Sequence, residues 1–270
     1  MADRVNLRAY EEKIRYYADF RDMNNLTAEV KELMDNHRAF FVGSGDFHHV
    51  SYMLIKNTHQ ADLNVIVFDN HPDNMFFPFG IHCGSWVYHA SRLPNVSSVA
   101  VFGITSDDIA GINVIQNMFS VIRAGKVRYF CLRPVGKMMR YMGGINIEAI
   151  TAPGIKITDV FDKYIKHNHH GPVYLSIDKD VLEPGVVGTT WDQGRMSKED
   201  LLQCIRSIAP RIACADICGD LSIYQYRDVI KRFMRRFDGT ERTLRSLDIE
   251  NERHIKLNRD LLSSITGNGM

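Results

Sequence analysis

Carboxylates and an imidazole follow one apolar segment at a spacing that suits metal binding. Asp69, His71 and Asp73 come directly after the run 63–68, which reads as a buried strand. In an extended chain, side chains two residues apart lie on the same side. Mixed oxygen and nitrogen donors suit a divalent cation, and such groups are costly to bury without a partner. The spacing therefore predicts metal ligands, with a polar turn as the alternative.

Two further segments of the same kind strengthen this interpretation. Asp178 and Asp180 end the apolar run 172–178, and the run 38–44 leads into Gly45-Asp46-Phe47-His48-His49. In open α/β sheets, ligands bind outside the carboxyl ends of the strands. Taken alone, each carboxylate pair could cap a turn, but the three segments together favour a shared metal site.

Strand-like and helix-like segments alternate along the chain, which predicts an α/β fold. Crossover helices require parallel strands. We therefore expect residues 1–270 to form a single doubly wound domain, with a mostly parallel sheet of about seven or eight strands flanked by helices. The expected strands are 38–44, 63–69, 97–104, 126–132, 154–158, 172–178 and 211–217. The expected helices include 8–36 with a break near Asn24-Asn25, a helix capped by Ser197, and two charged helices at 223–237 and 244–266.

Charge and composition exclude several classes of partner. The formal net charge is +1, so no overall field attracts nucleic acid or an anionic membrane. No apolar run reaches membrane-spanning length, and five cysteines without a CxxC pair favour a reducing compartment. We expect a cytoplasmic protein in which Cys214 and Cys218 are inert buried thiols. The basic run 231–236 is interpreted as a solvated helix face or a subunit contact, with a nucleic-acid surface as the lesser alternative.

The three ligand segments, in this order, resemble those of the arginase/agmatinase (ureohydrolase) family. That family carries Gly-Gly-Asp-His, Asp-Ala-His-x-Asp and Ser-Phe-Asp-x-Asp-x-x-Asp-Pro. The corresponding segments here are Gly45-Asp46-Phe47-His48, Asp69-Asn70-His71-Pro72-Asp73 and Ser176-Ile177-Asp178-Lys179-Asp180-Val181-Leu182-Glu183-Pro184. The resemblance covers roughly residues 38–220 and implies a divergent member with an arginase/deacetylase-like fold.

The resemblance also implies a ligand set for two ions per chain. Its register selects His48 rather than His49, although Phe47 replaces the family's aspartate. A carboxylate-rich set without thiolate suits Mn²⁺, with other divalent ions possible. One ion would take His48, Asp69, Asp73 and Asp178, and the other would take Asp69, His71, Asp178 and Asp180.

Two further residues have expected catalytic roles. His82 lies in Phe79-Gly80-Ile81-His82-Cys83-Gly84, which resembles the arginase segment whose histidine shuttles protons; the alternative is a histidine at a helix start. Arginases hold the substrate guanidinium with the Glu of an Asp-x-x-Glu segment, where this chain has Gly219 followed by Asp220. Asp220 either takes over that role or caps a helix.

The expected activity is hydrolysis of a C–N bond in a guanidino, amidino or formimino compound, by a hydroxide that bridges two metals. The partner would be a small-molecule substrate, and the protein a homo-oligomer. L-Arginine itself is a doubtful substrate, because Met75 replaces the asparagine that reads its amino-acid end in arginases. The alternatives are a deacetylase-type amide hydrolase of the same fold and a non-catalytic metal-binding relative.

Overall fold

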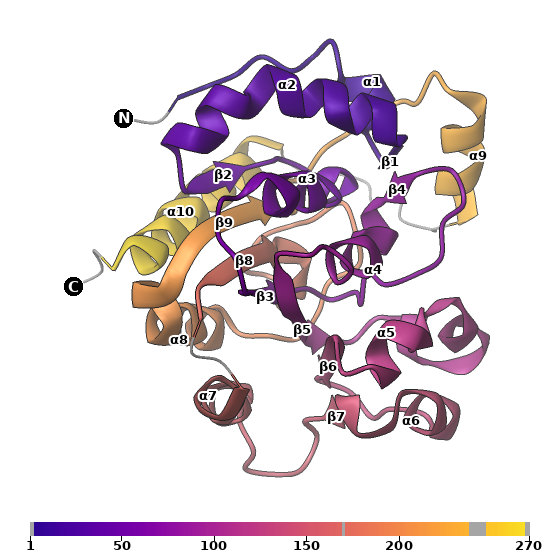
Figure 1. Ribbon diagram of the computed structural model, residues 1–270, viewed down its shortest axis with the longest axis vertical. Coiled ribbons are helices and arrows are strands. Elements are labelled where there is room, and N and C mark those ends of the chain that lie inside the picture. Colours follow the sequence, from indigo (N-terminus) through magenta and orange to yellow (C-terminus); the bar gives the residue numbers. More distant parts are fainter. Residues whose placement is uncertain (1–2, 169–170, 238–246, 268–270) are drawn as a thin grey trace.

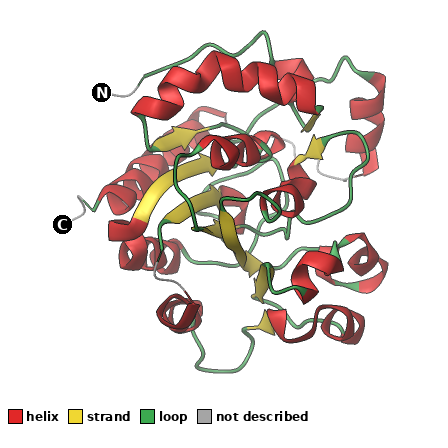
Figure 2. Ribbon diagram, viewed as in Figure 1, coloured by secondary structure: helices red, strands yellow, loops and turns green. Residues whose placement is uncertain are grey.

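A seven-stranded parallel sheet forms the centre of the protein (Figures 1 and 2). The computed structural model describes residues 3–168, 171–237 and 247–267 of the chain. The strand order is β2-β9-β8-β3-β5-β6-β7, and each neighbouring pair is parallel. This confirms the predicted α/β fold with a parallel sheet. The strands are β2 (Ala39–Phe41), β3 (Leu63–Phe68), β5 (Val96–Ile104), β6 (Val127–Cys131), β7 (Ile147–Ala149), β8 (Val173–Asp178) and β9 (Ile212–Cys218).

Helices cover both faces of the sheet, so its central strands are buried on both sides. In β3, Val65 and Val67 point into one hydrophobic core while Ile66 and Phe68 point into the other, as strand alternation requires. The first core contains side chains from α1 (Glu11–Ile14), α2 (Phe20–Asn36), α3 (Val50–Asn57), α4 (Trp86–Ala90), α5 (Phe119–Arg123) and α6 (Lys137–Gly143). The second contains side chains from α7 (Ile157–Asn168), α8 (Lys198–Ile208) and α10 (Leu247–Thr266).

Two small elements lie outside this sandwich. β1 (Tyr17–Ala18) pairs antiparallel with β4 (Ile81–His82), and α9 (Val229–Phe237) lies beside them at the edge of the molecule (Figure 1). Across the part of the chain that is described, no helix is both long and apolar enough to cross a lipid bilayer.

Three expected elements differ from the structure. The predicted strand at 154–158 is wrong: the edge strand is β7, and Ile157 begins α7 instead. The helix predicted at 8–36 breaks at 15–19, not at Asn24-Asn25, where α2 is continuous. The helix predicted at 223–237 begins only at residue 229, and residues 244–246 of the last predicted helix lie outside the described residues.

The sheet order brings the ligand segments together. β2, β9, β8 and β3 are consecutive neighbours, so their carboxyl ends lie side by side. At β3 the order also changes direction, because β8 lies on one side and β5 on the other. A crevice at such a reversal is the usual ligand site of an open α/β sheet.

Candidate metal centre

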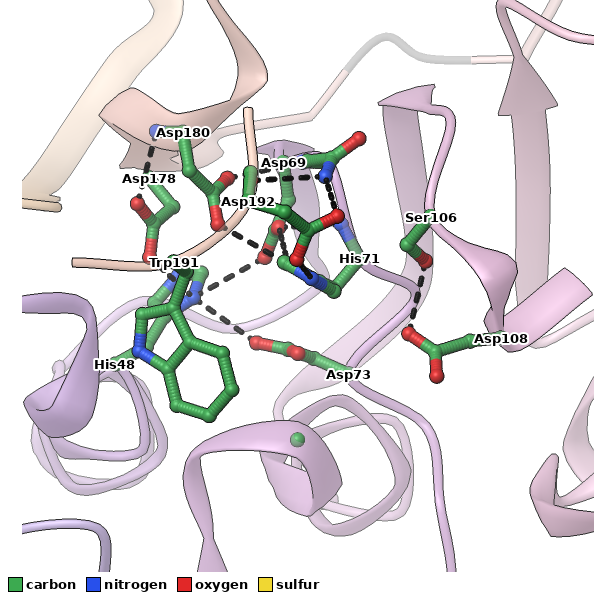
Figure 3. A network of polar contacts seen from close by, with 12 residues as sticks. His48, Asp69, His71, Asp73, Ser106, Asp108, Asp178, Asp180, Trp191 and Asp192 are labelled. Atoms are coloured by element: carbon green, nitrogen blue, oxygen red, sulfur yellow. Dashed lines mark hydrogen bonds and ion pairs between the residues drawn. The ribbon is translucent and has the colours of Figure 1, made fainter. Parts of the chain in front are cut away.

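All six predicted metal ligands lie together at the carboxyl ends of β2, β3 and β8 (Figure 3). His48 is at the centre of the first group. Its Nδ1 lies 3.2 Å from Asp69 Oδ2, 3.0 Å from Asp73 Oδ2 and 3.6 Å from Asp178 Oδ2. Neighbouring His49 is also buried but does not line the cavity described below.

His71 is at the centre of the second group. Its Nδ1 lies 3.0 Å from Asp180 Oδ2 and 3.5 Å from Asp69 Oδ1. Asp69 therefore contacts both histidines, one with each carboxylate oxygen. Such sharing is what a carboxylate that bridges two ions requires.

Backbone hydrogen bonds orient three of the carboxylates. The Oδ1 atoms of Asp69, Asp178 and Asp180 accept backbone N–H groups at 2.6, 3.1 and 3.1 Å. Their Oδ2 atoms are left facing the two histidines. Among the described residues, the buried Asp69 Oδ2 accepts no hydrogen bond, which is costly unless a cation lies beside it. The donors present therefore fit divalent metal.

The crowding of buried carboxylates opposes their ionisation. Burial, followed by the charge of Asp69, raises the pKa of Asp73 to about 7. Burial and the charges of Asp178 and Asp69 raise the pKa of Asp180 well above its usual value. A divalent cation would remove this penalty by favouring the charged carboxylates. Asp73 also has a positive φ of 46°, a strained conformation of the kind found at functional sites.

Further hydrogen bonds fix the ring of His48. Its Nε2 contacts Ser176 Oγ at 2.9 Å, and Ser176 Oγ donates to Asp216 Oδ1 at 3.0 Å. Burial alone would lower the pKa of His48, but Cys218, Asp69 and Asp73 outweigh it and raise that pKa well above its usual value. Ser176 and Asp216 thus leave Nδ1 as the nitrogen that faces the cluster.

Asp192 fixes the ring of His71, as Ser176 fixes the ring of His48. This role of Asp192 was not predicted from the sequence. Asp192 Oδ1 lies 2.9 Å from His71 Nε2, and its Oδ2 accepts a hydrogen bond from Asn70 at 3.0 Å. A carboxylate on the outer nitrogen of a metal-binding histidine fixes the tautomer and ring orientation. No local pattern marks Asp192, because it lies in a loop more than a hundred residues beyond His71.

Trp191 forms a wall beside the cluster and was also not predicted. Its ring meets His71 edge-on at 5.9 Å and runs parallel to Tyr16 at 6.2 Å between centroids. The indole N–H donates to the buried Asp46 at 3.1 Å. In Figure 3 the ring stands in front of His48. The hydrogen bond to Asp46 thus holds the Trp191 ring beside the predicted metal ligands.

The cluster opens into a cavity of about 800 Å³, within the range of small-molecule sites. One part of the wall is aromatic and apolar, with Tyr16, Met75, Trp191, Phe233 and Met234. The remaining lining residues outside the cluster are mostly polar: Gly45, Pro72, Asn74, His82, Cys83, Gly84, Ser106, Asp107, Asp108, Asn113, Gln116, Asn117 and Asp192.

His82 lines this cavity, as its predicted role requires. Its Nδ1 accepts the Gly84 N–H at 2.9 Å, so the ring proton is on Nε2. Burial and the positive charges of Arg235 and Lys231 lower its pKa to about 3. His82 is therefore neutral at neutral pH.

Comparison with known families shows which group of proteins has this fold and these segments. The model of the arginase family matches residues 4–227 of the chain, which is well over half of it. The chain belongs to the arginase family. This confirms the resemblance that the three ligand segments predicted.

The individual proteins that are similar to this chain differ from it at most positions. An uncharacterized protein of Thermotoga maritima is 32% identical over 194 residues, which cover 71% of this chain and 62% of that protein. The chain thus spans less than two thirds of that relative. An arginase from Bacillus caldovelox is 17% identical with a TM-score of 0.59, covering 100% of this chain and 82% of that one. At this identity the likeness shows the fold alone.

Two other solved structures with this fold have names other than arginase. Proclavaminate amidino hydrolase from Streptomyces clavuligerus is 16% identical with a TM-score of 0.58, covering 94% of this chain and 73% of that one. Formimidoylglutamase from Bacillus subtilis is 18% identical with a TM-score of 0.53, covering 91% of this chain and 67% of that one.

This member of the arginase family departs from the family pattern at the end of β9. Asp220 is not brought to the cavity: it forms an ion pair with Lys179 and lies 3.3 Å from His254 Nδ1. The predicted catalytic role of Asp220 therefore has no support from its position. Lys179, between two of the ligands, points away from the cluster and also donates to Asn258 at 3.1 Å.

The basic run in α9 is only partly a solvated face. Lys231 is buried, and its Nζ donates to the carbonyl oxygens of Glu12, Lys13, Arg15 and Tyr17 at 2.8 to 2.9 Å. The Arg235 guanidinium lies 4.2 Å from the centre of the Trp191 ring. These contacts attach α9 beside the cavity, where Phe233 and Met234 form part of the wall.

Proposed function

We propose that this protein is a metal-dependent hydrolase that cleaves a non-peptide C–N bond in an amidino, formimino or guanidino compound. The observation that carries the proposal is the convergence of carboxylate oxygens on the Nδ1 atoms of His48 and His71. Similar folds include proteins named as an amidino hydrolase and a formimidoylglutamase, which supports this substrate class.

Two divalent ions would be held by the six residues. The first position would use His48, Asp69, Asp73 and Asp178, and the second would use Asp69, His71, Asp178 and Asp180. When bound, such a pair of ions supplies a water nucleophile at neutral pH and stabilises developing negative charge. The oxygen-rich second position suits Mn²⁺.

The protein's own groups would position the substrate and exclude water. The parallel faces of Tyr16 and Trp191 offer an apolar wall for a planar amidino or formimino group. The Nε2–H of neutral His82 would donate a hydrogen bond to the nitrogen that leaves. Because its pKa is about 3, His82 stays neutral at neutral pH, so it would orient the leaving nitrogen through this hydrogen bond without transferring the proton.

The cavity argues against L-arginine as the substrate. Met75 presents a thioether where arginases read the amino-acid end of arginine, and Gly219 has no side chain to hold the guanidinium. Each polar substrate group left without a partner costs about 1–3 kcal/mol. We therefore propose an amidino or formimino compound.

A product-release screen tests the proposal. The protein loaded with divalent metal would be incubated with formimino, amidino and guanidino compounds, and with acetylated amines in parallel. Ammonia or urea release that is lost in Asp180→Asn supports the proposal. Acetate release without ammonia or urea would assign the deacetylase-type alternative, and no release from any compound would favour a non-catalytic metal-binding protein.

A further inference from the structure

The last residue of β9, Cys218, lies against the six-residue cluster and has no part in the function proposed above. It is fully buried, and its Sγ donates to Asp178 Oδ2 at 3.1 Å. It reaches this position because β9 pairs with β8 in a register that places Cys218 opposite Asp178. The sequence alone suggested an inert buried thiol, but Cys218 contacts a carboxylate oxygen that also faces His48.

The positions of the donors suit coordination of one ion. A ring nitrogen of His48, a carboxylate oxygen of Asp178 and Sγ of Cys218 all lie within 4.8 Å of one another. Bonds of roughly 2.0–2.3 Å to one ion separate its donors by about 3–4.5 Å. The separations of 3.1 Å for Sγ to Oδ2 and 3.6 Å for Oδ2 to Nδ1 agree with this range.

An independent observation also indicates a cation at this place. Asp69 Oδ2 is buried, lies 3.2 Å from His48 Nδ1 and accepts no hydrogen bond within the described part of the chain. His48, Asp69 and Asp73 form a second set of donors within 4.8 Å of one another. The two sets share His48, so both lie beside the same part of the cluster.

We propose that Cys218 is a thiolate ligand of the ion beside His48, and that this position therefore prefers a softer ion such as Co²⁺ or Zn²⁺ to Mn²⁺. Thiolate ligands favour such ions, whereas carboxylates favour Mn²⁺. On binding, the sulfur–metal bond forms and the Sγ proton passes to solvent, with no change of oxidation state. The position beside His71 keeps only nitrogen and oxygen donors. The inference rests on the proposed function, because it assumes that the cluster binds metal.

Cobalt spectroscopy tests this assignment without measuring activity. Metal-free protein would be titrated with Co²⁺ while the visible d–d bands and the near-ultraviolet thiolate-to-cobalt charge-transfer band are recorded. Wild type should show both. Cys218→Ser and Cys218→Ala should keep the d–d bands and lose the charge-transfer band. Cys131→Ser is the matched control, because Cys131 is equally buried at the end of β6, and it should keep both.

Each other outcome overturns the inference. Wild-type d–d bands without charge transfer, or charge transfer that persists in Cys218→Ser, would show that Cys218 is not a ligand while leaving the proposed function intact. Absence of all cobalt bands in wild type would contradict metal binding and thus the proposed function itself. If neither variant folds, absence of the charge-transfer band in wild type still overturns the inference.

Metal competition gives a second readout. With Mn²⁺ and Zn²⁺ in competition, Zn²⁺ should displace Mn²⁺ at a lower concentration from the position beside His48 than from the position beside His71. Cys218→Ser should shift the Zn²⁺ to Mn²⁺ affinity ratio at the position beside His48 toward Mn²⁺, because a thiolate favours Zn²⁺ over Mn²⁺. An unchanged ratio would contradict the proposal.

Discussion

Gly219 and Asp178 are so close that no side chain fits between them. A Cβ on Gly219 would lie 2.4 Å from Asp178 Oδ1 and 2.6 Å from the backbone nitrogen of Lys179. Gly219 also has a φ of +87°, which glycine adopts readily and other residues do not. The backbone conformation at this position therefore requires glycine. The change from the family's glutamate to Gly219 involves the backbone as well as the side chain.

We expect Gly219→Ala to weaken metal binding, because the added Cβ displaces the Asp178 carboxylate. The control is Gly185→Ala: Gly185 has a similar φ of +104°, and no described atom beyond its chain neighbours lies within 4 Å of the place that a Cβ would take. Backbone strain should cost both variants about 1–3 kcal/mol. Calorimetric metal titration should show reduced affinity only for Gly219→Ala. Equal affinity in both variants would show that Asp178 adapts.

Asp192→Asn should lower metal affinity by roughly 10–100-fold, the usual effect of removing a carboxylate that orients a metal-binding histidine. The amide can still contact His71 but can no longer favour one tautomer as strongly. Asp107→Asn is the control, because Asp107 lies at the cavity, pairs with Arg133 and is not in contact with the cluster. Metal titration of the two variants measures the effect. If they lose affinity equally, general loss of negative charge explains it.

His48→Ala should leave about one ion per chain, while His49→Ala should retain two, because only His48 faces the cluster. His49 is fully buried, so its truncation should still destabilise the fold by roughly 2–4 kcal/mol. Elemental analysis gives the stoichiometry, and denaturant unfolding gives the stability. A loss of metal in His49→Ala alone would show that His49, and not His48, is the ligand.

The stabilisation that metal gives should increase with pH. In the metal-free protein the pKa of Asp73 is raised from 3.8 to about 7 by burial and Asp69, and the pKa of Asp180 is raised in the same direction. Between about pH 4 and about pH 7, the folded metal-free protein thus binds more protons than the unfolded chain. Its free energy of unfolding therefore falls as pH rises through this range. Bound metal replaces those protons.

Melting temperatures with metal and with EDTA, from about pH 5 to about pH 8, check this sign. The difference between the two curves should widen toward high pH. A constant or narrowing difference would contradict the electrostatic description of the cluster.

The sequence predicted those parts of the protein that have a local signal. Asp69, His71 and Asp73 directly follow a fully apolar strand, so both the strand and the ligand segment could be recognised. The predicted break at Asn24-Asn25 was wrong because packing of Met23 and Leu26 in the core outweighs the weak helix propensity of asparagine. The predicted strand at 154–158 was wrong because a short apolar segment can equally begin a helix.

Long-range contacts account for the site residues that could not be predicted from the sequence. Trp191 and Asp192 meet His71 only because the loop after β8 folds back over the end of β3. Cys218 meets Asp178 through strand register, which no motif records. The ion pair of Asp220 with Lys179 likewise depends on packing between β8, β9 and α10.

The most direct test of the central claim is metal titration of the metal-free protein with simultaneous measurement of binding and of ammonia or urea release. Asp69 contacts both histidines, so we predict that release from a formimino or amidino compound appears as the second ion binds, and that Asp69→Asn abolishes it. Full occupancy by two ions without release from any compound in the screen, or release that persists in EDTA, would contradict it.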